Sequence, residues 1–413
     1  MISEKSIFER VVFIELANER APVPAGLFSL DIDTGVGRFA YGRRYLQRGD
    51  SIAVDPVNLP LAEQEYVTRK NSGIFGVLGD LLPDSWGKYI LAKRLNIPFG
   101  SLQPHEMFDY VTTNAVGALS LGLTPDQPFT RQEAPIAFNE LHKVAEAFVR
   151  AMSDEDLPAE VLYLLEQGTS LGGAQPKCPV IYNNSEWIAK FENARTPVNF
   201  PRIEFASMQL AELAGITVPE IRLEEISGSP VYLIKRFDRH EGRRVPFMSG
   251  QALSDLDLEE LEKGSYLEMA RQMRKFVKNV NRDLSELFRR MVFNVLIRNQ
   301  DDHLRNHGFI CLDQAWRLSP LYDVLPIPAR RTADNFSLSL NIGLEGTTAT
   351  LSNIYSRCEQ FNLARGQAEE IVAEVAEATA GWEEMLLRCG VEKTDIEAVR
   401  WCFEGFREAA GFQ

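Results

Sequence analysis

Residues 292–308 read Val-Phe-Asn-Val-Leu-Ile-Arg-Asn-Gln-Asp-Asp-His-Leu-Arg-Asn-His-Gly, and residues 318–324 read Leu-Ser-Pro-Leu-Tyr-Asp-Val. In the first half of this stretch, Val292, Val295 and Leu296 recur at helical spacing, which predicts a buried helix face. The helix leads into a polar loop, and a short strand then separates the loop from Asp323. This order of helix, acidic loop, strand and aspartate guides the interpretation of the rest of the chain.

The polar loop carries groups suited to phosphoryl transfer. Asp301 and Asn306 are five positions apart, as are the Asp and Asn of the protein-kinase catalytic loop. Such chemistry needs a carboxylate to accept a hydroxyl proton, and an amide oxygen and a second carboxylate to hold Mg²⁺. Asp301, Asn306 and Asp323 meet this requirement. Asp302 and His303 lie between them, and for His303 a structural role, donating to a backbone carbonyl, is favoured over that of general base.

A glycine-rich segment precedes a predicted hairpin. Residues 167–177 read Gln-Gly-Thr-Ser-Leu-Gly-Gly-Ala-Gln-Pro-Lys, and predicted strands at 178–182 and 187–191 follow, the second containing Lys190. Glycines let backbone amides approach a phosphate closely, and a lysine neutralises its charge. Taken singly, the glycines are usual in turns and the lysine is usual on a solvent-facing strand. The order of phosphate loop, strand lysine, catalytic loop and metal aspartate favours an ATP site.

The remaining pattern predicts a β-rich first part and a helical last part. A helix over 202–214 should end at Gly215, and Glu204 in its first turn is a candidate partner for Lys190. The other expected strands lie at 11–16, 26–31, 36–41 and 335–342, and a hairpin is expected at 218–224 and 231–235. Helices are expected at 88–95, within 136–167 with a break at 153–156, within 255–310, at 363–390 and at 394–410. Asp84 would begin the first of these helices, and Thr394 would open a capping box at the start of the last. The predicted domains are 1–125, 126–237 and 238–413.

Composition and charge limit the classes of protein to which the chain can belong. The 413 residues are 45% apolar and 25% charged, as in ordinary globular proteins. Neither a run of about 18 apolar residues nor a signal peptide is evident, and the five cysteines form no CxxC pair, so we expect a cytoplasmic protein without a membrane span. The net charge of −14 argues against bulk nucleic-acid binding.

The combined motifs resemble a known family. They are Ser170-Leu-Gly-Gly-Ala-Gln-Pro-Lys177, Lys190, Lys235-Arg-Phe-Asp-Arg239, Asp301-Asp-His-Leu-Arg-Asn-His307 and Leu321-Tyr-Asp-Val324. This set resembles HipA-like serine/threonine kinases, the toxins of bacterial HipBA toxin–antitoxin modules, over nearly the whole chain. The resemblance implies an α+β, two-lobed protein-kinase-like fold with a β-rich N-terminal subdomain and a mostly helical C-terminal lobe.

The resemblance also implies roles for individual residues. Asp301 would be the catalytic base, and Asn306 and Asp323 would hold Mg²⁺. Ser170 matches the family's autophosphorylated serine, whose phosphate would repel ATP through its charge of about −2. The implied ATP-binding residues are Ser170, Leu171, Gly172, Gly173, Ala174, Gln175, Lys190, Lys235, Arg236, Phe237, Asp301, Asp302, His303, Asn306 and Asp323.

The implied function is that of a toxin kinase. It would phosphorylate an aminoacyl-tRNA synthetase, typically the glutamyl enzyme, and so arrest growth and induce persistence. Its partner would be a HipB-like DNA-binding antitoxin, expected as a homodimer that bridges two toxin chains and contacts operator DNA. Two alternatives stay open at this stage: a small-molecule kinase, and a catalytically inactive co-repressor that binds its antitoxin.

Overall fold

The computed structural model describes residues 6–129, 131–152, 159–166, 175–192, 196, 198–328 and 336–412. Contacts group the chain into two compact units. The first comprises Met1–Lys190, Lys235–Leu258 and Phe309–Trp316; the second comprises Phe191–Ile234, Glu259–Gly308 and Arg317–Gln413. The division into three domains at 125 and 237 stays a prediction. Among the described residues, no helix has the length and apolar character that a membrane span requires.

The first unit is built on an antiparallel sheet in the order β4-β3-β2-β1-β5. Its strands are β1 (Ile7–Ile14), β2 (Val23–Asp31), β3 (Val36–Tyr41), β4 (Glu65–Thr68) and β5 (Leu119–Gly122). Phe28 and Phe39 point into the core, where both make edge-to-face contacts with Phe75. The β-rich first part that the sequence predicts is therefore confirmed.

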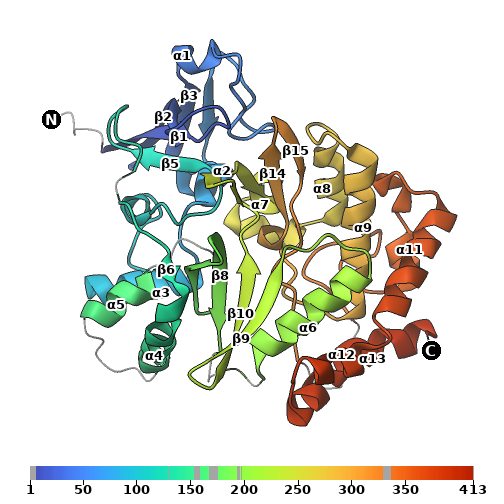
Figure 1. The fold of residues 1–413 in the computed structure, drawn as a ribbon. Helices are drawn as coiled ribbons and strands as arrows, with labels where there is room; N and C mark the ends of the chain where they lie inside the picture. Colours follow the sequence, from blue (N-terminus) through green and yellow to red (C-terminus); the bar gives the residue numbers. More distant parts are fainter. Residues whose placement is uncertain are drawn as a thin grey trace. The chain divides into compact units, whose positions relative to one another are not determined.

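A second group of strands in this unit carries the predicted lysine. The strands β7 (Lys177–Tyr182) and β8 (Ser185–Phe191) form an antiparallel hairpin, and β6 (Ile136–Ala137) pairs with β7 in parallel. The turn residues Asn183 and Asn184 both have positive φ, as a two-residue hairpin turn of type I′ requires. The helices α3 (Ser85–Leu95), α4 (Leu141–Met152) and α5 (Ala159–Glu166) pack together near them (Figure 1).

The first unit is completed by short elements. They are α1 (Arg43–Leu46), α2 (Gly76–Gly79), the pair β11 (Arg239–His240) and β12 (Arg243–Arg244), α7 (Gly250–Ser254), and a sheet of β13 (Phe247–Ser249), β14 (Gly308–Leu312) and β15 (Ala315–Leu318). Asp80 accepts hydrogen bonds from the backbone N–H and the hydroxyl of Ser249, at 2.8 and 2.6 Å. These bonds join the start of α7 to the end of α2.

The second unit begins with α6 (Phe200–Leu213) and a hairpin of β9 (Ile221–Ile226) and β10 (Ser229–Lys235). Asn199 caps α6, because its side chain accepts a bond from the backbone N–H of Arg202 at 3.1 Å. Gly215 has φ +74° just beyond the helix, the left-handed conformation that ends helices and favours glycine. The helix stop that the sequence predicts is thus confirmed.

Most of the regular elements in the second unit are helices. They are α8 (Tyr266–Met273), α9 (Val280–Leu296), α10 (Leu351–Tyr355), α11 (Arg365–Ala378), α12 (Trp382–Arg388) and α13 (Lys393–Ala410). The helix α9 packs against α8, α11 and α13 (Figure 1). Val292, Val295 and Leu296 are at most 1% exposed, so the predicted buried face of α9 is confirmed. This packing fixes the end from which the polar loop starts.

Three local predictions are wrong. Residues 336–342 form isolated bridges at Ser337 and Asn341 instead of a strand, because their partners are single loop residues; residue 335 lies outside the described ranges. The predicted helix over 363–390 is split into α11 and α12 by residues 379–381. Finally, α13 begins at Lys393, one residue before Thr394, so Thr394 cannot serve as the cap and no capping side-chain bond forms there.

Candidate active site

The catalytic loop predicted from sequence follows α9 directly. Arg298 has φ +51°, which turns the chain out of the helix, and the backbone N–H of Asn299 donates to the carbonyl of Asn294 at 2.9 Å. Beyond this turn Asp301 and His303 are exposed, whereas Asp302 and Asn306 are buried. The loop therefore presents one carboxylate to solvent and keeps its neighbour inside the protein.

Asn306 is oriented by the loop itself. Its side-chain Nδ2 donates to the backbone carbonyl of Asp301 at 2.9 Å, and its backbone N–H donates to the carbonyl of His303 at 2.9 Å. The short 3₁₀ turn Leu304–Asn306 brings these groups together. Because the nitrogen of the amide is used in this way, its oxygen is the end of the side chain suited to a cation.

The carboxyl group of Asp301 has an altered proton affinity. Desolvation within the loop raises the pKa of Asp301 above its usual range, and the charges of Asp323 and Asp302 act in the same direction, whereas His303 opposes them. Asp323 therefore lies close enough to Asp301 for its charge to change the pKa of Asp301. A carboxylate with a raised pKa is a stronger base, which suits the acceptance of a hydroxyl proton.

Asp323 stands in an unusual backbone conformation. Its φ is +58°, a region that costs a residue with a Cβ about 1 kcal/mol or more and that occurs often at functional sites. Two bonds hold the segment: the backbone N–H of Leu321 donates to the carbonyl of Thr217 at 2.9 Å, and the Tyr322 hydroxyl donates to the carbonyl of Arg305 at 2.7 Å. The second bond attaches the segment of Asp323 to the catalytic loop.

Two acidic groups, Glu204 and Asp323, act on the buried Tyr232. Tyr232 on β10 is fully buried, and its pKa is raised well above the usual value by burial and by the charges of Glu204 and Asp323. Glu204 in α6 is also fully buried. The idea that Glu204 partners Lys190 stays a prediction.

Asn306 and Asp323 offer the ligands that Mg²⁺ prefers. An amide oxygen and a carboxylate are hard oxygen donors, and protein sites for Mg²⁺ commonly supply only one or two carboxylates and leave the other positions to water and phosphate. Within the described ranges, no group of three or more His, Cys, Asp or Glu side chains is arranged to hold a metal. The donor set therefore fits a magnesium ion that is bound together with a nucleotide.

In the first unit, Lys190 has a second lysine opposite it. Lys177 on β7 and Lys190 on β8 are register partners, and they are 5% and 4% exposed. Gln175, just before β7, has its side-chain oxygen buried without a hydrogen-bond partner among the described residues. The other residues of the predicted phosphate loop, Ser170–Ala174, lie outside the described ranges, and their roles stay predictions.

The Lys235–Arg239 motif contains a buried ionic network. Arg236 donates from Nε and Nη2 to the two carboxylate oxygens of Asp238, at 2.9 and 2.7 Å, and Arg239 donates to the same carboxylate at 2.8 Å. Arg236 also donates to the carbonyls of Asn114 and Ala115. Although burial favours the neutral acid, the two guanidinium groups hold the pKa of Asp238 well below its usual range.

The neighbours of Arg236 in this motif are less enclosed. Lys235 places its ammonium 5.9 Å from the centre of the Trp187 ring, and Phe237 packs its ring 6.3 Å from that of Phe247. Both residues are partly exposed. Contact with the adenine stays a prediction for all three, and the side chain of Arg236 is already bonded to protein groups.

The structure thus gathers Asp301, Asn306 and Asp323 within the second unit, and it describes Lys190 and the Lys235–Phe237 segment within the first. The structural role favoured for His303, donating to a backbone carbonyl, stays a prediction: His303 is exposed, and the buried, hydrogen-bonded histidine is His307. The sequence analysis gave no role to Lys177, although this lysine ends the glycine-rich motif.

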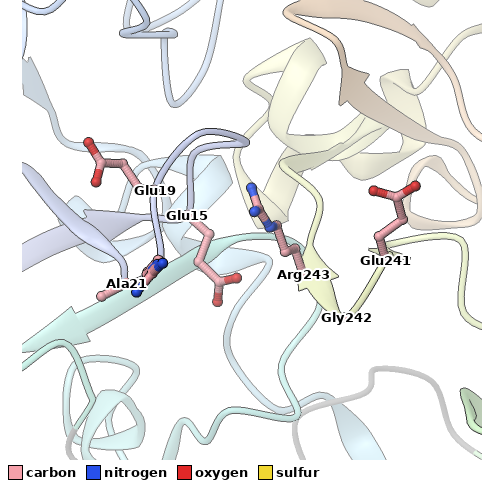
Figure 2. Close-up of a pocket in the computed structure, with 7 residues that line it drawn as sticks. Glu15, Glu19, Ala21, Glu241, Gly242 and Arg243 are labelled. Atoms are coloured by element: carbon pink, nitrogen blue, oxygen red, sulfur yellow. The ribbon is translucent and has the colours of Figure 1, made fainter.

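A separate small pocket lies in the first unit between the β1–β2 loop and the β11–β12 turn (Figure 2). It encloses about 290 Å³, and its charged lining residues are Glu15, Glu19, Arg20, Glu241 and Arg243. The predicted nucleotide-binding residues do not line it. Its mixed charges do not indicate a particular ligand.

The chain belongs to the HipA family. Residues 169–382 match the HipA-like C-terminal domain, and residues 22–122 match the HipA N-terminal domain. The first match includes the glycine-rich segment, Lys190, the catalytic loop and Asp323. The resemblance predicted from the motifs is therefore confirmed.

Individual relatives agree with this assignment. "Putative kinase Y4mE" of Sinorhizobium fredii is 24% identical over 73% of this chain and 74% of its own length. The serine/threonine-protein kinase toxin HipA of Shewanella oneidensis is 22% identical over 63% of this chain and 64% of its own length. A solved structure of the Shewanella oneidensis HipA, HipB and operator DNA complex matches with a TM-score of 0.68 and 17% identity, over 96% of this chain and 95% of that chain. The predicted HipA-like, mixed α and β fold is thereby confirmed.

Proposed function

We propose that this chain is a Mg²⁺- and ATP-dependent protein serine/threonine kinase and the toxin of a type II toxin–antitoxin system. The main support is the bond from the Asn306 side chain to the Asp301 carbonyl, in a loop whose Arg305 carbonyl accepts from Tyr322, the neighbour of Asp323. One turn therefore carries the solvent-exposed carboxylate of Asp301 and the oriented amide of Asn306, and the Tyr322 hydrogen bond links the segment of Asp323 to this turn.

In this proposal each group has one task. Asp301 accepts the proton of the substrate hydroxyl as its oxygen attacks the terminal phosphorus of ATP, and the bond from that phosphorus to the bridging oxygen breaks to release ADP. Asn306 and Asp323 would hold Mg²⁺, which when bound neutralises charge on the phosphates. Lys190, with the loop at 170–175, would contact the phosphates.

The proposed substrate is an aminoacyl-tRNA synthetase, with the glutamyl enzyme as first candidate, and Ser170 is the proposed site of autophosphorylation. Both rest on the family resemblance. The test incubates the purified chain with γ-labelled ATP and Mg²⁺, with and without individual synthetases. Label on one synthetase and on Ser170 supports the proposal. Label only on a small metabolite would indicate a small-molecule kinase, and ATP binding without any label would indicate an inactive co-repressor.

Two variants make this test sharper. Asp301→Asn should lower phosphoryl transfer at least about 100-fold, the usual contribution of a general base, with ATP affinity retained. Transfer at the wild-type rate would exclude Asp301 as the base. Ser170→Ala should lose self-labelling and keep transfer to the substrate; label retained by this variant would place autophosphorylation elsewhere.

The proposed partner is a HipB-like DNA-binding antitoxin, through which the complex would contact operator DNA. The support is the likeness to the HipA chain of the Shewanella oneidensis complex. A short helix-turn-helix protein encoded by the neighbouring reading frame should co-purify with this chain and relieve the growth arrest that its expression causes. Growth arrest that persists despite a co-expressed candidate would contradict that pairing.

A further inference from the structure

A buried polar network lies behind the catalytic loop. Asp302 is 1% exposed; its Oδ2 accepts a hydrogen bond from the Tyr266 hydroxyl, and its Oδ1 lies 2.9 Å from Nε2 of His307. We propose that Tyr266, Asp302 and His307 are positioning residues that fix the geometry of the catalytic loop. This inference rests on the proposed kinase function and assigns three residues that would act through Asp301 and Asn306.

The network extends into α9. Asn294 donates from Nδ2 to the Tyr266 hydroxyl oxygen at 2.9 Å, and Asn299 donates to the Asn294 side-chain oxygen at 3.2 Å. Burial and the neighbouring Asp302 raise the pKa of Tyr266 well above its usual value, so its hydroxyl keeps the proton that it donates. The rings of Tyr266 and His307 meet edge to face with centroids 5.0 Å apart. Both α8 and α9 thus contribute to holding one carboxylate.

The chain positions explain why this carboxylate matters. Asp302 is adjacent to Asp301, and His307 is adjacent to Asn306, so the Asp302–His307 contact closes the loop just behind its two proposed functional residues. A buried carboxylate must keep its hydrogen-bond donors, because losing one leaves a charge that the interior solvates poorly. The loop therefore has one favoured geometry, in which Asp301 faces solvent and Asn306 bonds to its carbonyl.

The network also assigns the proton on His307. Nδ1 of this ring is buried without a hydrogen-bond partner among the described residues, whereas Nε2 faces Asp302. The tautomer consistent with these contacts carries its proton on Nε2 and donates it to the carboxylate. A side chain that presents an N–H at the same place can replace this function, and one without a donor cannot.

The positioning role makes different predictions from direct contact with ATP. If Asp302 contacted the nucleotide, the loss of one of its hydrogen-bond donors would raise the dissociation constant for ATP. If the network positions Asp301 and Asn306, catalysis and metal binding should suffer and ATP affinity should not. If the network only stabilises the fold, any variant of equal stability should show the same loss.

The experiment compares Tyr266→Phe, His307→Ala and His307→Gln in the full chain. For each variant it measures kcat, the dissociation constant for ATP without metal, and the affinity for Mn²⁺ in the presence of ATP, followed by electron paramagnetic resonance. We expect Tyr266→Phe and His307→Ala to lower kcat at least tenfold, weaken Mn²⁺ binding severalfold and leave ATP affinity within twofold. His307→Gln should restore most of the kcat that His307→Ala loses.

The control is Phe361→Leu in the same unit. Phe361 is buried and packs its ring 5.2 Å from that of Phe288, outside the network. This variant should lower the melting temperature and leave kcat at 25 °C unchanged. A loss of kcat in Phe361→Leu as large as in Tyr266→Phe, or a Tyr266→Phe variant with weakened ATP binding and normal Mn²⁺ binding, would overturn the inference. If the wild type transfers no phosphate, the kinase proposal fails, and the Mn²⁺ measurements still test the network.

Discussion

Lys177 and Lys190 face each other across the β7–β8 hairpin, and both are buried. Directly opposed residues of an antiparallel pair project from the same face with Cβ atoms about 5 Å apart, and like charges at such positions repel. A pair of cations arranged in this way suits a polyanion, and ATP is the polyanion that the proposed function requires. The structure thereby makes Lys177 a candidate for phosphate contact beside the lysine found by sequence.

Replacing either lysine should weaken ATP binding. We expect Lys190→Met and Lys177→Met each to raise the dissociation constant at least tenfold, equivalent to about 1.4 kcal/mol, because each removes one cation from the proposed phosphate site. Isothermal titration calorimetry measures this constant. Lys143→Met, at an exposed lysine paired with Glu140, is the control and should not change it. Unchanged affinity in both hairpin variants would exclude the pair from nucleotide binding.

The rate of transfer should depend on the raised pKa of Asp301. Only the ionised carboxylate can accept a proton, so activity should fall on acidification at a pH above about 3.9, the usual value for Asp. His303 lowers this pKa, so His303→Gln should raise it further and move the acid limb of the kcat/KM profile to higher pH. A limb that moves to lower pH would show that Asp301 does not control this titration.

The Arg236–Asp238–Arg239 network should stabilise the first unit. Asp238→Asn removes the anion between two buried guanidinium groups and should lower the free energy of unfolding by about 3–5 kcal/mol. Chemical denaturation measures this loss. Asp126→Asn, at an exposed loop position that bonds only to Thr124 among the contacts described, should leave the free energy of unfolding nearly unchanged. Equal effects in the two variants would contradict a stabilising role for the network.

The same network should give stability an acid dependence. The pKa of Asp238 is lower in the folded chain than the usual value of about 4 in an unfolded one. Its contribution is therefore complete above about pH 4 and is lost as the pH falls from there toward the folded pKa. In Asp238→Asn this part of the acid dependence should disappear; a variant with an unchanged acid profile would assign it to other groups.

Local patterns identified much of this chain because the relevant residues are close in sequence. The spacing of Asp301 and Asn306 reflects one turn of the chain, and the strand predicted at 36–41 has the same bounds as β3. Gly215 ends α6 as expected, since the left-handed conformation after a helix depends on the local backbone. In each case a short-range rule determines the structure.

Contacts between residues far apart in the chain could not be predicted from local sequence patterns. Arg236 bonds to carbonyls about 120 residues earlier in the chain, and Tyr266, at the start of α8, donates to Asp302 in the loop after α9. His303 and His307 are four positions apart and equally polar, so sequence alone could not tell which of them is buried. The failed strand at 336–342 has the same cause: its alternation is real, but the second strand that would pair with it is missing among the described residues.

The left-handed backbone of Asp323 separates the requirements of folding from those of activity. Glycine adopts this conformation without the cost of about 1 kcal/mol that a Cβ imposes, which offsets the larger chain entropy that glycine loses on folding, so Asp323→Gly should melt close to the wild-type temperature while it transfers no phosphate. A variant that melts well below the wild type would show that the carboxylate supports the fold. An inert but intact chain could be produced in growing cells at high yield, which would allow its natural targets to be captured by affinity before any phosphate is exchanged.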